Sequence, residues 1–175
     1  MRWGIMGTGG VAHAFAEALK DVPGAVLSGV WSRNVGKAQA LADQYEYPGP
    51  LEIGEYRTIM PDARVDAVYV ATPASHHHAH ALLALRAGKL VLCEKPFATS
   101  EAQARAMFLE AHDRGLLIME AAWPRFLPAW STLRDLDVGE IRAIEASFGG
   151  RADFQPKARP FRPELGGGAL LDAMV

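Results

Sequence analysis

The chain has 175 residues, of which 50% are hydrophobic and 22% charged, with a formal net charge of −2 and one cysteine, Cys93. This balance indicates a globular protein and argues against a nucleic-acid-binding protein, which would carry a basic excess. No apolar run approaches the length of a membrane span, and the sequence enters a strand at once, which leaves no room for a signal peptide. Because one cysteine cannot form an internal disulfide, the composition predicts a cytoplasmic protein.

Short apolar runs alternate with helical patterns over the first 122 residues. The sequence predicts strands at 2–7, 25–32, 66–72, 90–95 and 116–122. Helical patterns occupy 11–22, 35–46, 75–88 and 99–115. Weaker patterns predict a short edge strand within 47–53 and a short helix at 56–60. Strands that alternate with helices predict a doubly wound parallel α/β sheet with helices on both faces.

The pattern changes after residue 122. Two prolines and a short amphipathic helix follow, and then residues 140–150 alternate between apolar and polar side chains. Such alternation predicts a strand with one face open to solvent. We therefore expect a dinucleotide-binding domain at 1–122 and the beginning of an α+β second domain, incomplete, at 123–175.

The segment "GTGGVA" lies directly between the first strand and the first helix. In a dinucleotide-binding loop Gly7 allows a tight turn, Gly9 leaves room for a pyrophosphate, and Ala12 lets helix and strand pack closely. The helix N-terminus adds amide groups and a partial positive charge for phosphate. The candidate cofactor-binding residues are Gly7, Thr8, Gly9, Gly10, Val11 and Ala12. The alternative interpretation is a strand–helix turn that needs glycine for its own geometry.

The end of the second strand lacks the acidic residue that an NAD site usually places there to bind the ribose hydroxyls. No acid occurs between Val22 and Gln39, and Ser32, Arg33 and Lys37 stand there instead. Two cations and a hydroxyl suit a 2′-phosphate, so the sequence favours NADP over NAD. The alternative interpretation is a solvated cluster of surface charges.

Four histidines lie within five positions of "ATPASHHHAHA". They invite a metal hypothesis, but neither an HExxH pattern nor a cysteine cluster accompanies them, so we predict no metal site. The preceding Thr72 and Pro73 stand at the carboxyl end of a central strand, where ligands bind in open α/β sheets.

The segment "CEKP" ends the next strand with Glu94, Lys95 and Pro96. A lysine at the end of a buried run is costly unless its ammonium group has a partner, and the proline restricts the backbone that precedes it. Lys95 could bond a substrate hydroxyl, lower its pKa and favour hydride loss to nicotinamide. The alternative is a surface lysine whose stem alone is buried.

The segments "GTGGVA", "ATPASHH", "AGKLVLCEKP" and "GGGALLD" together resemble the glucose–fructose oxidoreductase/inositol dehydrogenase (Gfo/Idh/MocA) family in order and spacing. Within the family, "VLCEKPFATS", "GLLIMEAAWPRFLPA" and "EASFG" resemble NADP-dependent dimeric dihydrodiol dehydrogenases and D-xylose dehydrogenases. The resemblance implies a Rossmann fold and hydride transfer between NADP and the CH–OH group of a trans-dihydrodiol, sugar or polyol.

The resemblance also implies residue roles. Arg33 and Lys37 would take the 2′-phosphate, Lys95 would be catalytic, and Asp172 would orient the substrate. The remaining implied contacts to cofactor or substrate are Thr72, Pro73, His77, Glu94, Arg125, Trp123 and Phe148. Trp123 and Phe148 could equally be packing residues.

In the family pattern a glycine follows two positions after the aspartate, and a histidine or tyrosine two further on. Here Met174 takes the glycine position and the sequence ends at Val175. We therefore expect a chain shortened at its C-terminus relative to the family, with a small-molecule substrate and a homodimer weakened by the incomplete second domain. The rival hypotheses are a nucleotide-binding module without turnover and a purely structural subunit.

Overall fold

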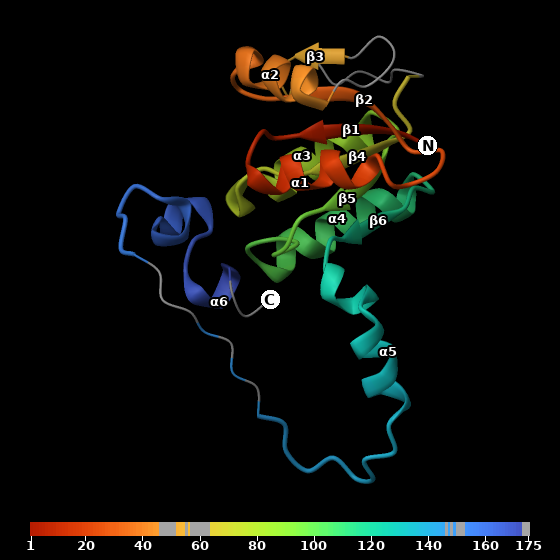
Figure 1. Cartoon of the computed structure of the whole chain (residues 1–175), viewed down its shortest axis with the longest axis vertical. Coiled ribbons are helices and arrows are strands. Elements are labelled where there is room, and N and C mark those ends of the chain that lie inside the picture. Colours follow the sequence, from red (N-terminus) through yellow and green to blue (C-terminus); the bar gives the residue numbers. More distant parts are fainter. Residues whose placement is uncertain are drawn as a thin grey trace.

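The computed structural model describes residues 1–45, 52–54, 56, 64–145, 147, 149 and 153–172. Six parallel strands form one sheet in the order β3-β2-β1-β4-β5-β6 (Figure 1). The strands are β1 (Arg2–Met6), β2 (Val26–Trp31), β3 (Glu52–Gly54), β4 (Ala67–Val70), β5 (Leu90–Cys93) and β6 (Ile118–Glu120). The helices between them are α1 (Gly10–Leu19), α2 (Val35–Tyr45), α3 (Ala74–Arg86) and α4 (Glu101–Asp113).

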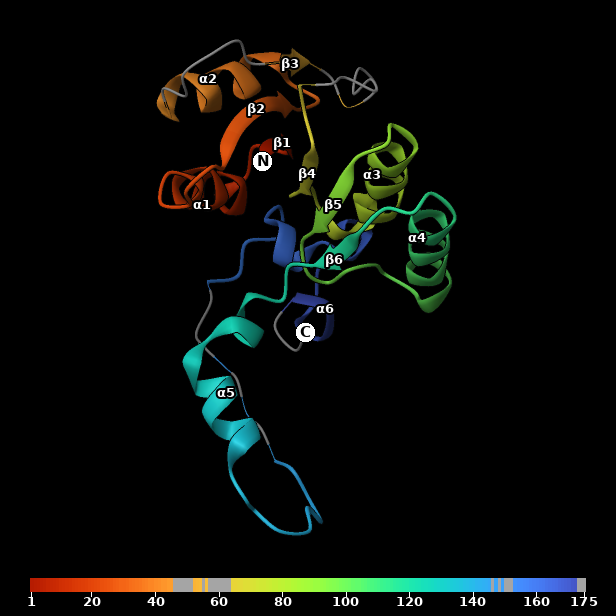
Figure 2. The same ribbon diagram turned by 90° about the vertical axis from the view of Figure 1, so that its right-hand side faces the viewer.

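The helices cover both faces of the sheet, as the alternating pattern predicted. Figure 2 shows α1 and α2 on one side of the strands and α3 and α4 on the other. One core cluster holds the inner residues of α1 and α2, among them Ala16 and Leu41, and a second holds those of α3 and α4, among them Leu85 and Met107. All four residues of the central strand β4 are buried, because helices cover that strand on both sides. The doubly wound α/β prediction is confirmed.

The strand order creates a switch point between β1 and β4. From β1 the chain moves outward to β2 and β3, and then crosses back to place β4 on the other side of β1. The loops that follow β1 and β4 therefore diverge, which leaves a crevice at the carboxyl edge of the sheet. Of the edge strand predicted within 47–53, residues 52 and 53 belong to β3, which pairs with β2, and residues 47–51 lie outside the described residues.

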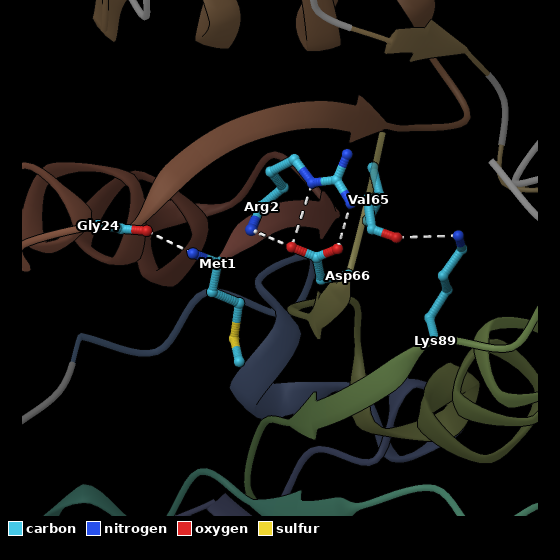
Figure 3. A network of polar contacts seen from close by, with 6 residues as sticks. All are labelled: Met1, Arg2, Gly24, Val65, Asp66 and Lys89. Carbon is cyan, nitrogen blue, oxygen red and sulfur yellow. Dashed lines mark hydrogen bonds and ion pairs between the residues drawn. The ribbon is translucent and has the colours of Figure 1, made fainter. Parts of the chain in front are cut away.

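The opposite, amino edge of the sheet is closed by a polar network (Figure 3). Asp66, directly before β4, accepts bonds from the main-chain amide of Arg2 at 2.7 Å and from its guanidinium at 2.5 Å. These bonds lower the pKa of the Asp66 carboxyl to about 2. Lys89, directly before β5, donates to the carbonyl of Val65 at 2.9 Å. The network ties the starts of β1, β4 and β5 together, away from the crevice.

The chain leaves the sheet after β6. A short turn (η2, Trp123–Phe126) leads into α5 (Pro128–Asp135), which extends away from the sheet (Figure 1). Three short elements follow after the next loop: η3 (Arg159–Phe161), η4 (Pro163–Leu165) and α6 (Ala169–Asp172). This last segment returns to the sheet, since a Cβ atom added to Gly166 would lie 2.7 Å from Cβ of Ala74 at the start of α3.

The strand predicted at 140–150 is wrong for the described part of that range. Residues 141–145, 147 and 149 carry no strand, and residues 141–145 are exposed. A strand needs a neighbour to pair with its amide and carbonyl groups, and none of the described strands lies beside this segment. The helix predicted at 56–60 lies outside the described residues except for Tyr56. The domain boundary near residue 122 stays a prediction.

None of the helices within the described ranges is long and apolar enough to cross a membrane.

Candidate coenzyme site

A cleft of about 940 Å³ opens at the carboxyl edge of the sheet. Its walls are the glycine loop after β1, the turn after β2, and the residues that follow β4 and β5, with Arg159 from the C-terminal segment. Pockets for small molecules and cofactors usually have about 300–1,000 Å³ and occur at such switch points. The fold thus gathers into one cavity residues that are far apart in the sequence.

The glycine loop has the geometry that close backbone approach requires. Gly7 has φ +119°, and a Cβ atom there would lie 2.5 Å from the carbonyl oxygen of Ala71. Gly9 is the N-cap of α1 and provides no side-chain cap, and at Gly9 and Gly10 an added Cβ would meet no atom within 4 Å. The start of α1 therefore faces open space where a phosphate group fits. Thr8 and Val11 line the cleft as well.

The turn after β2 brings the predicted cations to the same cleft. Ser32, Arg33 and Lys37 all line it. The buried hydroxyl of Ser32 accepts a bond from the amide of Asn34 at 3.2 Å, and the Asn34 side chain accepts one from the amide of Lys37 at 3.1 Å. Asn34 thereby caps α2 and fixes the turn that carries Arg33.

The residues after β4 form the third wall. Thr72 and Pro73 line the cleft, and Pro73 is the N-cap of α3. The Thr72 hydroxyl bonds Nδ1 of His80 at 3.0 Å, and the His80 ring packs on Tyr56, another lining residue, with ring centroids 4.3 Å apart. Burial, with repulsion from the neighbouring histidines and Arg33, lowers the pKa of His80 to about 4. The imidazole is therefore neutral near pH 7.

Glu94 and Lys95 form the fourth wall, directly after β5. One carboxylate oxygen of Glu94 accepts a bond from the Tyr69 hydroxyl at 2.5 Å, and the other accepts one from the Lys95 amide at 3.1 Å. Burial and the bond to Glu94 raise the pKa of the Tyr69 phenol far above its usual value, so the phenol stays a donor. Burial likewise raises the pKa of the Cys93 thiol, which leaves that thiol unsuited to nucleophilic chemistry.

His77 does not line the cleft, although the resemblance implied that it would. Its ring is buried and bridges two loops, with Nδ1 2.8 Å from the carbonyl of Pro96 and Nε2 2.7 Å from that of Thr72. A neutral imidazole donates to only one of these carbonyls. Burial lowers the pKa of His77, whereas both carbonyls act in the opposite direction. His77 thus links the loop after β4, at the carbonyl of Thr72, to the loop after β5, at the carbonyl of Pro96.

Three further predicted residues lie elsewhere. Ala12 is fully buried in the core between α1 and the sheet, where it allows close packing but does not reach the cleft. Arg125 lines a separate groove along α5, and Trp123 is 64% exposed, because the chain turns away from the sheet after β6. Phe148 lies outside the described residues. The backbone of Asp172 ends α6, but its side chain is not among those described.

Sequence reasoning missed four lining residues: Asn34, Tyr56, Ala71 and Arg159. Asn34 follows a predicted strand and precedes a predicted helix, a position that favours a capping residue, so it could have been found. Arg159 stands in a proline-rich segment that the sequence presents only as a polar loop. Among the described residues no group of three histidine, cysteine, aspartate or glutamate side chains could hold a metal ion.

Residues 1–122 match the oxidoreductase family with an NAD-binding Rossmann fold that is named Gfo/Idh/MocA. The chain belongs to this family. Trans-1,2-dihydrobenzene-1,2-diol dehydrogenase of Macaca fuscata fuscata is 36% identical over 98% of the chain and 52% of its own length. D-xylose 1-dehydrogenase (NADP(+)) of Hypocrea jecorina is 34% identical over 100% of the chain and 50% of its own length. The chain thus spans about half the length of these curated Gfo/Idh/MocA relatives.

Solved structures of the family agree. A variant of KijD10, a 3-ketoreductase of Actinomadura kijaniata in complex with TDP-benzene and NADP, superposes with a TM-score of 0.83. That structure is 34% identical in sequence, and the match covers 98% of this chain and 53% of that one. The predicted family and fold are therefore confirmed by sequence and by structure.

Proposed function

We propose that this chain forms the coenzyme-binding part of an NADP-dependent oxidoreductase that acts on the CH–OH group of a trans-dihydrodiol, a sugar or a polyol. The observation that carries the proposal is that one cleft is lined by an open glycine loop, two cations and Lys95. A dinucleotide carries a pyrophosphate, and NADP carries a further phosphate, so these groups match the charges of the ligand.

Different residues of the cleft bind different groups of the coenzyme. The amides at the start of α1 bind the pyrophosphate, with Arg159, which lines the same cleft, as an additional cation. Arg33 and Lys37 bind the 2′-phosphate. The coenzyme supplies a nicotinamide ring that accepts or returns a hydride.

Lys95, in the wall that follows β5, supplies the acid–base chemistry. Its amine would accept the hydroxyl proton as the alcohol is oxidised, and its ammonium group would return that proton to the carbonyl oxygen in the reverse direction. Glu94 accepts bonds from the Tyr69 hydroxyl and from the Lys95 main-chain amide, which fixes its side chain in the same wall of the cleft. Asp172 keeps its predicted role in orienting the substrate. The substrate class rests on the relatives, a dihydrodiol dehydrogenase and a D-xylose dehydrogenase.

Titration of the purified protein with NADPH and NADH tests the coenzyme assignment. We expect NADPH to bind at least tenfold more tightly than NADH, since charge-assisted bonds to a phosphate contribute about 1.5–3 kcal/mol. Arg33→Ala and Lys37→Ala should each weaken NADPH binding by about tenfold and leave NADH binding nearly unchanged. Arg105→Ala, which removes an exposed arginine on α4, is the matched control. Tighter binding of NADH would contradict the assignment.

Hydride transfer with dihydrodiols or D-xylose, followed by NADPH absorbance, tests the catalytic part. Lys95→Met should lower the rate by about 10²–10⁴-fold with coenzyme binding retained. Tight NADPH binding with no turnover at high protein concentration would instead favour a nucleotide-binding module.

A further inference from the structure

The C-terminal glycine run offers an inference about how the cleft is completed, and it rests on the proposed function. Arg159 is the one cleft residue among the described ones that comes from beyond residue 122. It stands in η3, and the glycine run from Gly166 to Gly168 follows a few residues later. The Gly166 backbone is buried, whereas Arg159 is exposed at the cleft.

Backbone hydrogen bonds fold residues 158–168 into a closed loop, which we call the arginine loop. The amide of Gly167 donates to the carbonyl of Arg162 at 3.0 Å, and that of Gly168 donates to the carbonyl of Pro160 at 3.0 Å. At the end of η3 the amide of Arg162 donates to the carbonyl of Arg159 at 3.1 Å. The position of Arg159 is therefore set by the glycines at the other end of the loop.

At Gly166 and Gly167 the surrounding atoms leave no room for a side chain. A Cβ atom on Gly167 would lie 2.4 Å from the carbonyl oxygen of Arg159 and 2.8 Å from that of Pro160. Gly166 has φ +77°, and a Cβ atom there would lie 2.7 Å from Cβ of Ala74 and 3.3 Å from the amide nitrogen of Ser75. Gly167 thus shapes the loop internally, and Gly166 presses it against the first turn of α3.

We propose that Gly166 and Gly167 are positioning residues that seat the arginine loop on α3, so that the Arg159 guanidinium completes the coenzyme cleft beside Lys95. The site is then built from two parts of the chain. The glycine loop after β1 admits the coenzyme, and the second glycine run holds a cation over the pyrophosphate. The same arrangement places a positive charge near His77, whose pKa Arg159 acts to lower.

The test measures NADPH binding by Arg159→Ala, Gly167→Ala and Gly166→Ala. We expect Arg159→Ala to weaken binding by about tenfold, and each glycine variant by about three- to tenfold, because a displaced loop carries the guanidinium away. Gly149→Ala is the control for an added methyl group, since a Cβ atom there would meet no atom of the other described residues within 4 Å. Gly115→Ala is the control for left-handed backbone strain, with φ +63° and open space. Both controls should bind NADPH as the parent protein does.

The double variant Arg159→Ala/Gly167→Ala separates positioning from general damage. If Gly167 acts through Arg159, the second substitution adds nothing to the first. An equal further loss in the Arg159→Ala background would overturn the inference, as would unchanged binding by Arg159→Ala.

Adenosine 2′-monophosphate, which lacks the pyrophosphate and nicotinamide, provides the second readout. It should bind all these variants like the parent protein and lose affinity in Arg33→Ala. Loss of its binding in the glycine variants would overturn the inference. If neither ligand binds the parent protein, the proposed function itself fails, so the two failures can be told apart.

Discussion

Single residues around the cleft are held mainly by one another, and each bond joins two walls or fixes one turn. Ser32 and Asn34 fix the turn of Arg33, His77 joins the loops after β4 and β5, and Tyr69 holds Glu94. Such interlocked bonds reduce the reorganisation that coenzyme binding requires. A substitution at one of these residues should therefore alter the shape of the cleft more than the small exposed area of its side chain suggests.

The partly buried imidazole of His80 should make the free energy of unfolding depend on pH. Because its folded pKa of about 4 lies below its usual 6.5, its stabilising effect is complete above pH 6.5 and is lost as the pH falls toward 4. We expect it to account for about 1–2 kcal/mol of the free energy of unfolding lost across that window, after allowance for its partial exposure.

His80→Gln should therefore lose less stability between pH 6.5 and pH 4 than the parent protein, as measured by urea unfolding at several pH values. His112→Gln, at an exposed histidine of α4, is the control. Identical pH profiles for parent and His80→Gln would contradict this account.

At the scale of elements, the site depends on how strand ends turn into helices. Each wall follows the carboxyl end of a parallel strand, and the loops must clear one another at the switch point between β1 and β4. Gly7 is where this clearance is tightest, since its backbone lies against Ala71 at the end of β4. Its amide also donates to the carbonyl of Trp31 at the end of β2 at 2.9 Å, so the loop touches both neighbours of β1.

Gly7→Ala should destabilise the protein by about 2–4 kcal/mol, because it combines a positive φ with a backbone clash. For a chain of this size that corresponds to a fall in Tm of about 5–15 °C in thermal unfolding. NADPH affinity should fall as well, since the loop must move. Gly24→Ala, with φ +77° and open space around it, is the control and should cost no more than about 1 kcal/mol. Equal losses in the two variants would rule out the clash.

At the scale of the whole molecule, the compact part and the extended part differ in burial. Both core clusters lie within residues 5–118, whereas Phe126, Trp130 and Leu133 around α5 are at least half exposed. Residues 136–145 are exposed and lack a paired strand. Segments of this kind open and are cut by proteases more readily than a packed sheet.

Limited proteolysis tests this division. Trypsin should cut first after Arg134 or Arg142, which are both exposed, and should leave the residues up to β6 intact. Mass spectrometry of the early products identifies the sites. An initial cut after Arg86 or Arg105, within α3 and α4, would contradict both the division and the predicted domain boundary near residue 122.

The local order of residues by itself determined the elements of the sheet, the doubly wound class and the cations after β2, because periodicity, glycine spacing and the absence of an acid are properties of adjacent residues. The capping role of Asn34 is local too and could have been read there. Only the tertiary structure decided that His77 is buried between two loops, that Arg125 and Trp123 turn away, and that Arg159 reaches the cleft. These positions depend on contacts between segments far apart in the chain. For the same reason alternation at 140–150 predicted a strand wrongly: pairing requires a neighbour, and no local pattern reports whether one is there.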